Sequence, residues 1–411
     1  MTQARRVNVL ALSYLFPNRA HPSYGIFVLN RLKAAHEHCS MRVVAPVQWY
    51  PFMAWLRGAL WSADVPRHEI IEGLDVHHPR FPVIPRYMKW FDALSYYWAA
   101  LSVVKRLRGE SFEMDLIDAH WTYPDVVAAY WLARRYRKPF IVTVRGHEAL
   151  YLEERTLRRR MVAYYLRKAD LVVTLSEELR DKVVGLGVAP QRARVVLNGV
   201  DRSRFRRMDQ ADCRARLGLP QDKRILISVG RFTENKGHHD IIKALPTIQR
   251  RYPLELYIIG GINPEDSFEK ELRTLIADLG LTNVHLLGKV DHDRLPTCYG
   301  AADLFCLATH REGCPNAVLE ALSCGTPAVV AEVGAVRALI KPGENGYLLT
   351  SYETESIARA LIQALDHEWE RGRIAAGMES WGWSRCGQQV VELYHAVTNA
   401  GVIGHQLPHP P

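Results

Sequence analysis

The fold of this chain is decided by the stretch Glu312-Gly313-Cys314-Pro315-Asn316-Ala317-Val318-Leu319-Glu320, followed by Ala321-Leu322-Ser323-Cys324-Gly325-Thr326-Pro327. Residues 302–307 before it form a short apolar run that is typical of a buried strand. Pro315 suits the first turn of a helix, where a missing N–H costs nothing. Gly325 and Pro327 end that helix. The stretch therefore predicts a strand–loop–helix unit with one carboxylate before the helix and another inside it.

The inner carboxylate is Glu320, and its neighbours at helical spacing are Asn316, Ala317, Ala321 and Cys324. None of these is a cation, so we expect the hydrogen-bond donors that a carboxylate needs to come from elsewhere. Hydroxyl groups of a bound sugar or ribose would serve, and the helix N-terminus offers a place for phosphate. The alternative is a surface helix with two solvated glutamates.

Apolar runs of strand length alternate with helical patterns through both halves of the 411-residue chain. Such alternation is typical of parallel sheets covered by helices, and two arrays predict two doubly wound α/β domains. We place the boundary between Val200 and Lys223, in a charged connection. The expected strands are Val7–Ser13, Met41–Ala45, Leu116–Ala119, Phe140–Val144 and Leu171–Leu175, then Ile225–Val229, Leu254–Ile259, Val284–Leu287, Leu304–Leu307 and Ala328–Val330.

Polar and glycine residues collect after these predicted strands. Ligands of open α/β sheets bind outside the carboxyl ends of the strands. In the first half, Gly25 opens a helix after a long loop, and His120 and Arg145-Gly146-His147 each follow a strand. In the second half, Gly230–Gly237 and Glu312 do the same. Two such edges that face each other would form an interdomain cleft.

Composition excludes several classes of protein. With 48% hydrophobic and 24% charged residues, the sequence is that of an ordinary soluble globular protein. No run of about 18 apolar residues is present, so no spanning helix is expected. Residues 7–13 fit a first buried strand better than a signal peptide. Seven cysteines without a Cys-x-x-Cys pair favour reduced thiols in the cytoplasm over a disulfide framework or a zinc site.

The net charge of +9 leaves nucleic acid, anionic lipid and a nucleotide diphosphate open as partners. The sequence carries no zinc finger, basic heptad region or RNA-binding aromatic signature, so we expect no nucleic-acid partner. The segments Trp49–Trp61 and Phe81–Val104 are rich in aromatic residues, and cations accompany the second. Such mixtures suit a membrane interface. The alternative is a buried surface between helices.

Two stretches resemble motifs of the retaining glycosyltransferases of family 4: Gly230-Arg231-Phe232-Thr233-Glu234-Asn235-Lys236-Gly237, and the Glu-x7-Glu pattern from Glu312 to Glu320. The resemblance implies a GT-B fold, an α/β architecture of two doubly wound Rossmann-like domains that face each other across a cleft. It implies an acceptor-binding domain at residues 1–200 and a nucleotide-sugar-binding domain at residues 201–379. A C-terminal helix, at about residues 380–398, is expected to cross back to the first domain.

The same resemblance implies a role for each candidate site residue. Arg231 and Lys236 hold the diphosphate of the donor, and Glu320 holds its ribose. The two catalytic candidates are Glu312, at the donor sugar, and His120, at the sugar and the acceptor. Further donor-binding residues are expected at Gly313, Cys314, Pro315, Asn316 and Gly25. The acceptor or sugar side is expected at Arg145, where many relatives carry histidine, and at His147.

These roles imply a retaining glycosyltransferase that needs neither a metal nor a cofactor. Its donor is a nucleotide-diphosphate sugar, and its acceptor is a lipid-linked glycan or polysaccharide of the cell envelope. We expect a cytoplasmic protein, peripheral to the inner face of the cytoplasmic membrane and in contact with its anionic surface. One alternative is a sugar-nucleotide epimerase on the same fold, and another is a non-catalytic basic binding protein. The donor base stays open between UDP, GDP and ADP.

Overall fold

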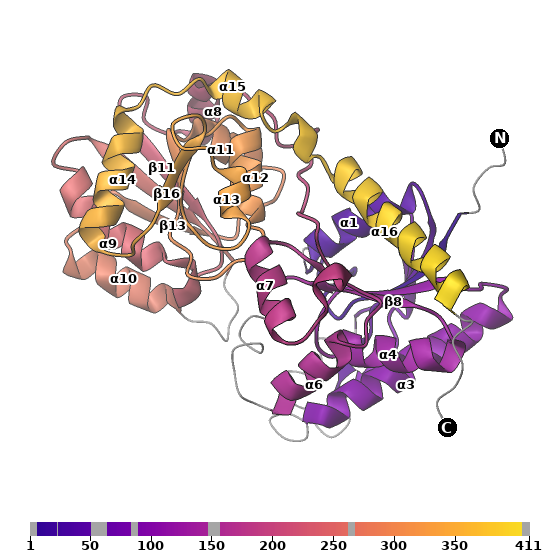
Figure 1. Cartoon of the computed structure of the whole chain (residues 1–411). Helices are drawn as coiled ribbons and strands as arrows, with labels where there is room; N and C mark the ends of the chain where they lie inside the picture. The colour runs from indigo at the N-terminus through magenta and orange to yellow at the C-terminus, as the bar shows by residue number, and fades with distance from the viewer. Residues whose placement is uncertain are drawn as a thin grey trace. The chain divides into compact units, whose positions relative to one another are not determined.

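The computed structural model describes residues 6–22, 24–50, 64–83, 89–146, 157–261 and 268–404 (Figure 1). The chain divides into two compact units, Met1–Asn198 with Trp383–Pro411, and Gly199–Gly382. The boundaries predicted from sequence, after residues 200 and 379, lie two and three residues from these divisions. Each unit is an α/β domain with its own largely parallel sheet, which confirms the predicted fold class.

The first unit contains an eight-stranded sheet. In spatial order its strands are β10 (Ala193–Val195), β9 (Leu171–Thr174), β8 (Phe140–Val144), β7 (Leu116–Ala119), β1 (Asn8–Leu12), β2 (Ser40–Val44), β5 (Leu74–His77) and β4 (His68–Ile71). All neighbours run parallel except β4 and β5, an antiparallel pair that the sequence analysis did not predict. A separate parallel pair joins β3 (Val47–Trp49) to β6 (Arg80–Pro82). The helices are α1 (Ile26–His36), α3 (Lys89–Gly109), α4 (Asp125–Tyr136), α6 (Leu157–Leu166), α7 (Glu177–Gly185), the 3-10 turn η2 (Pro190–Arg192) and α16 (Trp383–Gly404).

The second unit contains a six-stranded parallel sheet. In spatial order its strands are β13 (Val284–Gly288), β12 (Leu254–Ile259), β11 (Arg224–Val229), β14 (Leu304–Leu307), β15 (Ala328–Ala331) and β16 (Gly346–Leu349). Its helices are α8 (Gln210–Leu217), η3 (Glu234–Lys236), α9 (His238–Ile248), α10 (Phe268–Asp278), α11 (Leu295–Ala301), α12 (Asn316–Ser323), α13 (Val336–Leu339), α14 (Thr354–Asp366), α15 (Arg371–Ala376) and η4 (Glu379–Trp381). Numbered along the unit, the strand order is 3-2-1-4-5-6. The direction of winding therefore reverses between β11 and β14, where such sheets bind ligands.

Five strands, three in the first sheet and two in the second, are buried along their whole length. Every residue of β7, β8, β9, β14 and β15 is buried. Parallel strands covered by helices on both faces need apolar side chains on both faces, so they appear in the sequence as unbroken apolar runs. This is why these strands could be predicted from the sequence.

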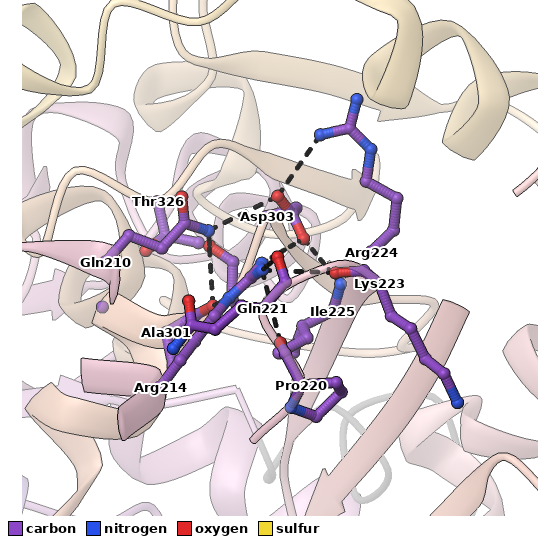
Figure 2. A network of polar contacts seen from close by, with 12 residues as sticks. Gln210, Arg214, Pro220, Gln221, Lys223, Arg224, Ile225, Ala301, Asp303 and Thr326 are labelled. Carbon is purple, nitrogen blue, oxygen red and sulfur yellow. Dashed lines mark hydrogen bonds and ion pairs between the residues drawn. The ribbon is translucent and has the colours of Figure 1, made fainter. Parts of the chain in front are cut away.

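A buried arginine holds the segment that enters the second sheet (Figure 2). Arg214 on α8 donates from Nη2 to Asp303 Oδ2 over 2.7 Å and from Nε to Ala301 O over 3.0 Å. Its Nη1 lies 3.3 Å from the carbonyl oxygen of Lys223. Asp303 Oδ2 also accepts from the backbone N–H of Ile225 over 2.6 Å. A buried ion pair is tolerated when hydrogen bonds satisfy its remaining polar atoms, and this one fixes the starts of β11 and β14 together.

The C-terminal helix α16 belongs to the first unit, as predicted, and it packs against α1. A glycine permits the close approach, because a Cβ added at Gly387 would lie 2.5 Å from the carbonyl carbon of Ala34. Residues 368–397 do not form one continuous helix. The segment contains α15, the single turn η4 and the beginning of α16, separated at Gly377 and Gly382.

The loops that leave β11 and β14 are hydrogen-bonded to each other. The carbonyl oxygen of Asn235 accepts from Thr309 Oγ1 over 3.0 Å and from the backbone N–H of His310 over 2.8 Å. Gly237 has a φ of +66° and lies against Ala308, whose carbonyl oxygen would be 1.9 Å from a Cβ added at the glycine. Because the two strands are neighbours, these contacts combine the two loops into one rigid element at the point where the winding reverses.

This packing should make Gly237 sensitive to substitution, and Gly343 provides a matched control. Gly343 also has a positive φ, +78°, but an added Cβ there meets nothing within 4 Å. We expect Gly343→Ala to lower the free energy of unfolding by about 1 kcal/mol, the cost of a left-handed backbone alone. Gly237→Ala should cost at least about 2 kcal/mol more, because the clash adds to that cost. Urea unfolding of both variants measures the difference, and equal losses would contradict the packing described.

Candidate functional site

The first feature of the candidate site is an ion pair between two predicted site residues. Lys236 Nζ, at the end of η3, contacts Glu312 Oε1, in the loop between β14 and α12. Their side chains are 20% and 15% exposed, so the pair is only partly shielded from solvent. The rigid pairing of the two loops brings together residues that are 76 positions apart in the sequence. The structure thus places a cation and a carboxylate side by side at the switch point of the second sheet.

The backbone between Glu312 and α12 is anchored on the segment that follows β15. The carbonyl oxygen of Gly313 accepts from the backbone N–H of Ala335 over 2.9 Å. A Cβ added at Gly334 would lie 2.4 Å from the carbonyl oxygen of Glu312. Cys314 is buried and Asn316 is partly exposed. Pro315 was expected inside the first turn of the helix, but it is the N-cap, with α12 beginning one residue later because ψ at Pro315 is 101°.

The inner carboxylate, Glu320, has partners within the protein. Tyr299 donates to Glu320 Oε2 over 2.9 Å, and His292 Nε2 lies 3.6 Å from Glu320 Oε1. Burial, followed by the charge of Glu320, raises the pKa of Tyr299 well above its ordinary value, so the phenol stays a donor. The donors that were expected from outside the helix therefore come at least in part from the protein itself. Tyr299 precedes Glu320 by 21 residues, a distance at which no sequence pattern identifies a partner.

The turn after β11 is shaped by a buried histidine that the sequence analysis missed. His238 lies 3.1 Å from Ser228 Oγ through Nδ1 and 3.2 Å from the carbonyl oxygen of Gly230 through Nε2. Burial lowers the pKa of His238 to about 4, so the ring is neutral at physiological pH. It acts as a hydrogen-bonding bridge rather than a cation. The bridge orients the backbone just before Arg231, whose side chain is exposed.

In the first unit, Gly25 is the N-cap of α1 and has a φ of +74°. A Cβ added there would lie 2.6 Å from the carbonyl oxygen of Leu15. Packing within the loop after β1 therefore already requires glycine at this position, without any contribution from a ligand. His147, which was predicted on the acceptor or sugar side, lies outside the residues that the structure describes.

The structure brings His120 and Arg145 together in the first unit. His120 follows β7 and is completely buried. Arg145 Nη2 lies 2.8 Å from His120 Nδ1, and His120 Nε2 lies 3.0 Å from Asp118 Oδ2. Because a guanidinium can only donate, Nδ1 accepts and Nε2 carries the ring proton. Burial lowers the pKa of His120, which keeps this tautomer neutral.

The carboxylate of this cluster, Asp118, was not among the predicted site residues, although it lies two residues before His120 and hence on the same face of β7. Burial raises the pKa of Asp118, but His120 and a hydrogen bond from Tyr394 on α16 outweigh it and hold the pKa below its ordinary value. Arg145 thus engages Nδ1 of His120, whereas Nε2 lies close to Asp118 without the geometry of a hydrogen bond. Because the ring is completely buried, a sugar hydroxyl could reach it only after the surrounding side chains move.

Among the residues with described side chains, two groups have the spacing of a metal site. One is His68, Asp75 and His77, and the other is His239, Asp240 and His310. Neither group includes Glu312 or Glu320. The Lys236–Glu312 pair is itself a poor metal site, because the ammonium already occupies the carboxylate.

Comparisons with known proteins identify the family. The sequence matches the model of "Glycosyl transferases group 1" over residues 209–380 and that of "Glycosyltransferase Family 4" over residues 59–204. One relative is the putative teichuronic acid biosynthesis glycosyltransferase TuaC of Bacillus subtilis. It is 24% identical over 368 residues, which cover 88% of this chain and 90% of TuaC.

Solved structures of glycosyltransferases share the fold along almost the whole chain. Sucrose-phosphate synthase from Thermosynechococcus elongatus has a TM-score of 0.77 at 19% identity, with 96% of this chain and 100% of that one covered. Anabaena Alr3699/HepE in complex with UDP-glucose has a TM-score of 0.71 at 20% identity, with 95% and 100% covered. Two family models that follow one another along the sequence, and whole-chain likeness to solved glycosyltransferases, agree with the two doubly wound units. The chain therefore belongs to the family 4, group 1 glycosyltransferases and has their GT-B fold.

Proposed function

We propose that this glycosyltransferase moves a sugar from a nucleotide-diphosphate sugar to a lipid-linked or polysaccharide acceptor of the cell envelope, with retention at the anomeric carbon and without a metal. The observation that carries the proposal is the Lys236–Glu312 ion pair at the switch point of the second sheet, beside the helix that bears Glu320. The relationship to TuaC, a putative teichuronic acid enzyme, supports the envelope acceptor. The UDP-glucose bound to HepE supports the class of donor.

The diphosphate of the donor binds at Lys236 and Arg231. An ammonium has three donors, and Glu312 occupies one of them, so Lys236 can hold the carboxylate and a phosphate oxygen together. Glu312 thereby fixes the direction of the cation before the donor arrives. The exposed Arg231 supplies a second positive charge on the same loop. Preorganised cations stabilise the charge that develops on the leaving diphosphate, which is the largest contribution that a site without a metal can make.

Glu320 binds the ribose of the donor. An ionised carboxylate has about four acceptor positions, and Tyr299 uses one of them. The side chain is 15% exposed, so positions remain within reach of ribose hydroxyls. Tyr299 holds the carboxylate in one orientation, which lowers the entropy that ribose binding costs. The backbone from Gly313 to Asn316 completes the donor side.

Retention follows a front-face course, in which the leaving phosphate oxygen takes the proton of the acceptor hydroxyl. Retaining glycosidases instead use a carboxylate nucleophile paired with a second carboxylic acid about 5 Å away. Glu312 is paired with a lysine, and such a carboxylate suits binding of the donor sugar better than nucleophilic attack. On the acceptor side we assign His120, Arg145 and His147, with Gly25 at the phosphate.

The membrane is the proposed location of the acceptor. Exposed aromatic side chains lie on three neighbouring helices of the first unit: Trp98 on α3 is 58% exposed, Trp131 on α4 47% and Tyr164 on α6 45% (Figure 1). Lys168 lies 5.5 Å from the ring centre of Tyr164. Aromatic residues mixed with cations suit an anionic membrane surface. We therefore propose a cytoplasmic enzyme that binds the inner face of the membrane peripherally.

The second aromatic segment contains both buried and exposed side chains. Phe81 and Tyr96 are buried against each other, with ring centres 5.2 Å apart, whereas Trp98 faces solvent. The alternative of a buried surface thus applies to Phe81 and Tyr96, and the exposed Trp98 supports the proposed membrane interface. Residues 51–61 of the first aromatic segment lie outside the described chain. Along the residues that the structure describes, no helix is both long and apolar enough to cross a bilayer.

Two alternatives make different predictions. A sugar-nucleotide epimerase would release free or epimerised sugar without an acceptor, so analysis of the products separates it from a transferase. A non-catalytic basic protein would bind anions with a strong dependence on salt and would not depend on Glu312 or Glu320.

The donor side is tested by replacing its charged residues. We expect Lys236→Ala to reduce transfer of sugar from the nucleotide donor into membrane glycan by about 10²–10³-fold, the loss typical of one preorganised electrostatic contact. Glu320→Gln should raise the KM for the donor, because the ribose loses a charged acceptor. Lys341→Ala is the control, since Lys341 is 73% exposed and pairs only loosely with Glu344, 3.9 Å away. Full turnover by Lys236→Ala with an intact fold would remove the basis of the assignment.

Freedom from metal is checked in the same assay. Transfer should survive a chelator, and loss of activity that Mn²⁺ or Mg²⁺ restores would contradict the metal-free mechanism.

Membrane binding is tested by cosedimentation with liposomes. The protein should bind anionic vesicles at low salt and release them at high salt. Trp98→Ala should weaken binding several-fold, because an exposed indole is lost from the interface. Leu287→Ala removes a side chain of similar exposure, 48%, from β13 in the second unit and should change nothing. Absence of binding at low salt, or equal weakening by both variants, would contradict the proposed surface.

A further inference from the structure

A second group of polar side chains lies beside the donor loops but takes no part in the function proposed above. His239 and Asp240 are in the first turn of α9, and His310 is in the loop after β14, two residues before Glu312. His310 Nε2 lies 3.0 Å from Asp240 Oδ2, and His239 Nε2 lies 3.3 Å from Asp240 Oδ1. One ligand atom from each residue can be chosen so that all three lie within 4.8 Å of one another.

The two shorter distances, which involve different oxygens of Asp240, are close to those between neighbouring ligands of a tetrahedral metal site. Zinc binds imidazole nitrogen and carboxylate oxygen at about 2.0–2.1 Å, which places neighbouring ligands about 3.3 Å apart. The distances from Asp240 to His310 and to His239 are therefore close to the distance between two ligands of one zinc ion. Hydrogen bonds between the same groups would give similar distances, so a binding experiment must distinguish the two.

The three side chains are held in place by their surroundings. The ring of His310 stacks on Tyr352 at 4.1 Å with an angle of 12°, and Tyr352 donates to the carbonyl oxygen of Thr309 over 3.0 Å. The ring of His239 packs edge-on against Phe268. The carboxylate of Asp240 is 10% exposed, whereas the side chain of His310 is 39% exposed. The group is thus rigid on the inside and open on the side of His310, where a water could complete the coordination.

The similar group in the first unit is less suited to a metal. Arg42 Nε lies 3.0 Å from Asp75 Oδ2, and Arg106 donates to His77 Nδ1 over 2.9 Å. Because Arg106 occupies Nδ1, the ring proton of a neutral His77 is on Nε2, the nitrogen that faces Asp75. A metal bound to Nε2 would move the ring proton to Nδ1, where it would face the guanidinium of Arg106. In the second unit the cation beside Asp240 is Lys243, at 3.8 Å, whose 46% exposed side chain can turn into solvent.

We propose that His239, Asp240 and His310 bind one zinc-class divalent cation, with water in the fourth position. Two nitrogen ligands and one oxygen ligand favour Zn²⁺ or Co²⁺ over Mg²⁺ and Ca²⁺. The ion joins α9, which follows Lys236, to the loop that carries Glu312. It therefore holds these two segments together without touching the donor, and the metal-free transfer proposed above does not require it.

The affinity should be lower than that of a structural zinc site. Metal-bound histidines usually donate their second N–H to a carboxylate or carbonyl, and loss of that partner costs about 10–100-fold in affinity. His239 Nδ1 is buried and has no hydrogen-bond partner among the described residues. The site accordingly suits reversible binding better than permanent occupancy.

Titration of Co²⁺ into the untagged, chelator-treated full chain tests the proposal. Wild type should take up one equivalent with the visible absorption of four-coordinate cobalt, and its melting temperature should rise with Co²⁺ concentration. His310→Ala and Asp240→Asn should abolish the absorption and the rise. His285→Ala is a matched control, because His285 is 37% exposed and pairs with Glu255 over 2.7 Å without a second histidine. His68→Ala removes a ligand from the other group. Both controls should bind as wild type does.

Three outcomes would overturn the proposal: no saturable binding by wild type, unchanged binding by His310→Ala, or loss of binding in His68→Ala. Thermal unfolding without metal verifies that His310→Ala is folded. If it is not, His310→Asn takes its place and is subject to the same criteria. Because the readouts are absorption and melting temperature, the result is independent of whether the proposed transferase reaction is correct.

Discussion

The parallel pairing of β11 with β14 is the constraint on which the site depends. These strands are distant in sequence but adjacent in the sheet, because the winding reverses between them. The loops that leave the carboxyl ends of the two strands therefore lie at the same place, and no helix lies between these loops. In the first unit, β1 and β7 stand in the same relation, with Gly25 after one strand and His120 after the other.

The strand pairing alone would not position side chains to within an ångström. Buried polar groups do so at both ends of the second sheet. The Arg214–Asp303 pair fixes the starts of β11 and β14, and the hydrogen bonds of Asn235 join the loops at their ends. Lys236 and Glu312 are therefore paired before a ligand arrives. Such preorganisation means that little reorganisation is needed when charge develops in a reaction.

The sequence predicted those parts of the structure that repeat locally. Buried parallel strands such as Leu304–Leu307 are unbroken apolar runs, and Gly325 ends its helix by a local rule. Contacts between distant segments could not be predicted. Tyr299 reaches Glu320 only because α11 packs against α12. His120 contacts Arg145, which follows the neighbouring strand, and no spacing rule specifies this pairing.

Binding of a nucleoside diphosphate to the full chain tests the central claim most directly. A site made by Lys236, Glu312 and Glu320 should bind one of UDP, GDP and ADP, and the melting temperature should rise with its concentration because the ligand binds only the folded protein. The rise should disappear in Lys236→Ala and persist in Lys341→Ala. If none of the three nucleotides raises the melting temperature, or if Lys236→Ala responds as wild type does, the ion pair at the switch point is not the donor site.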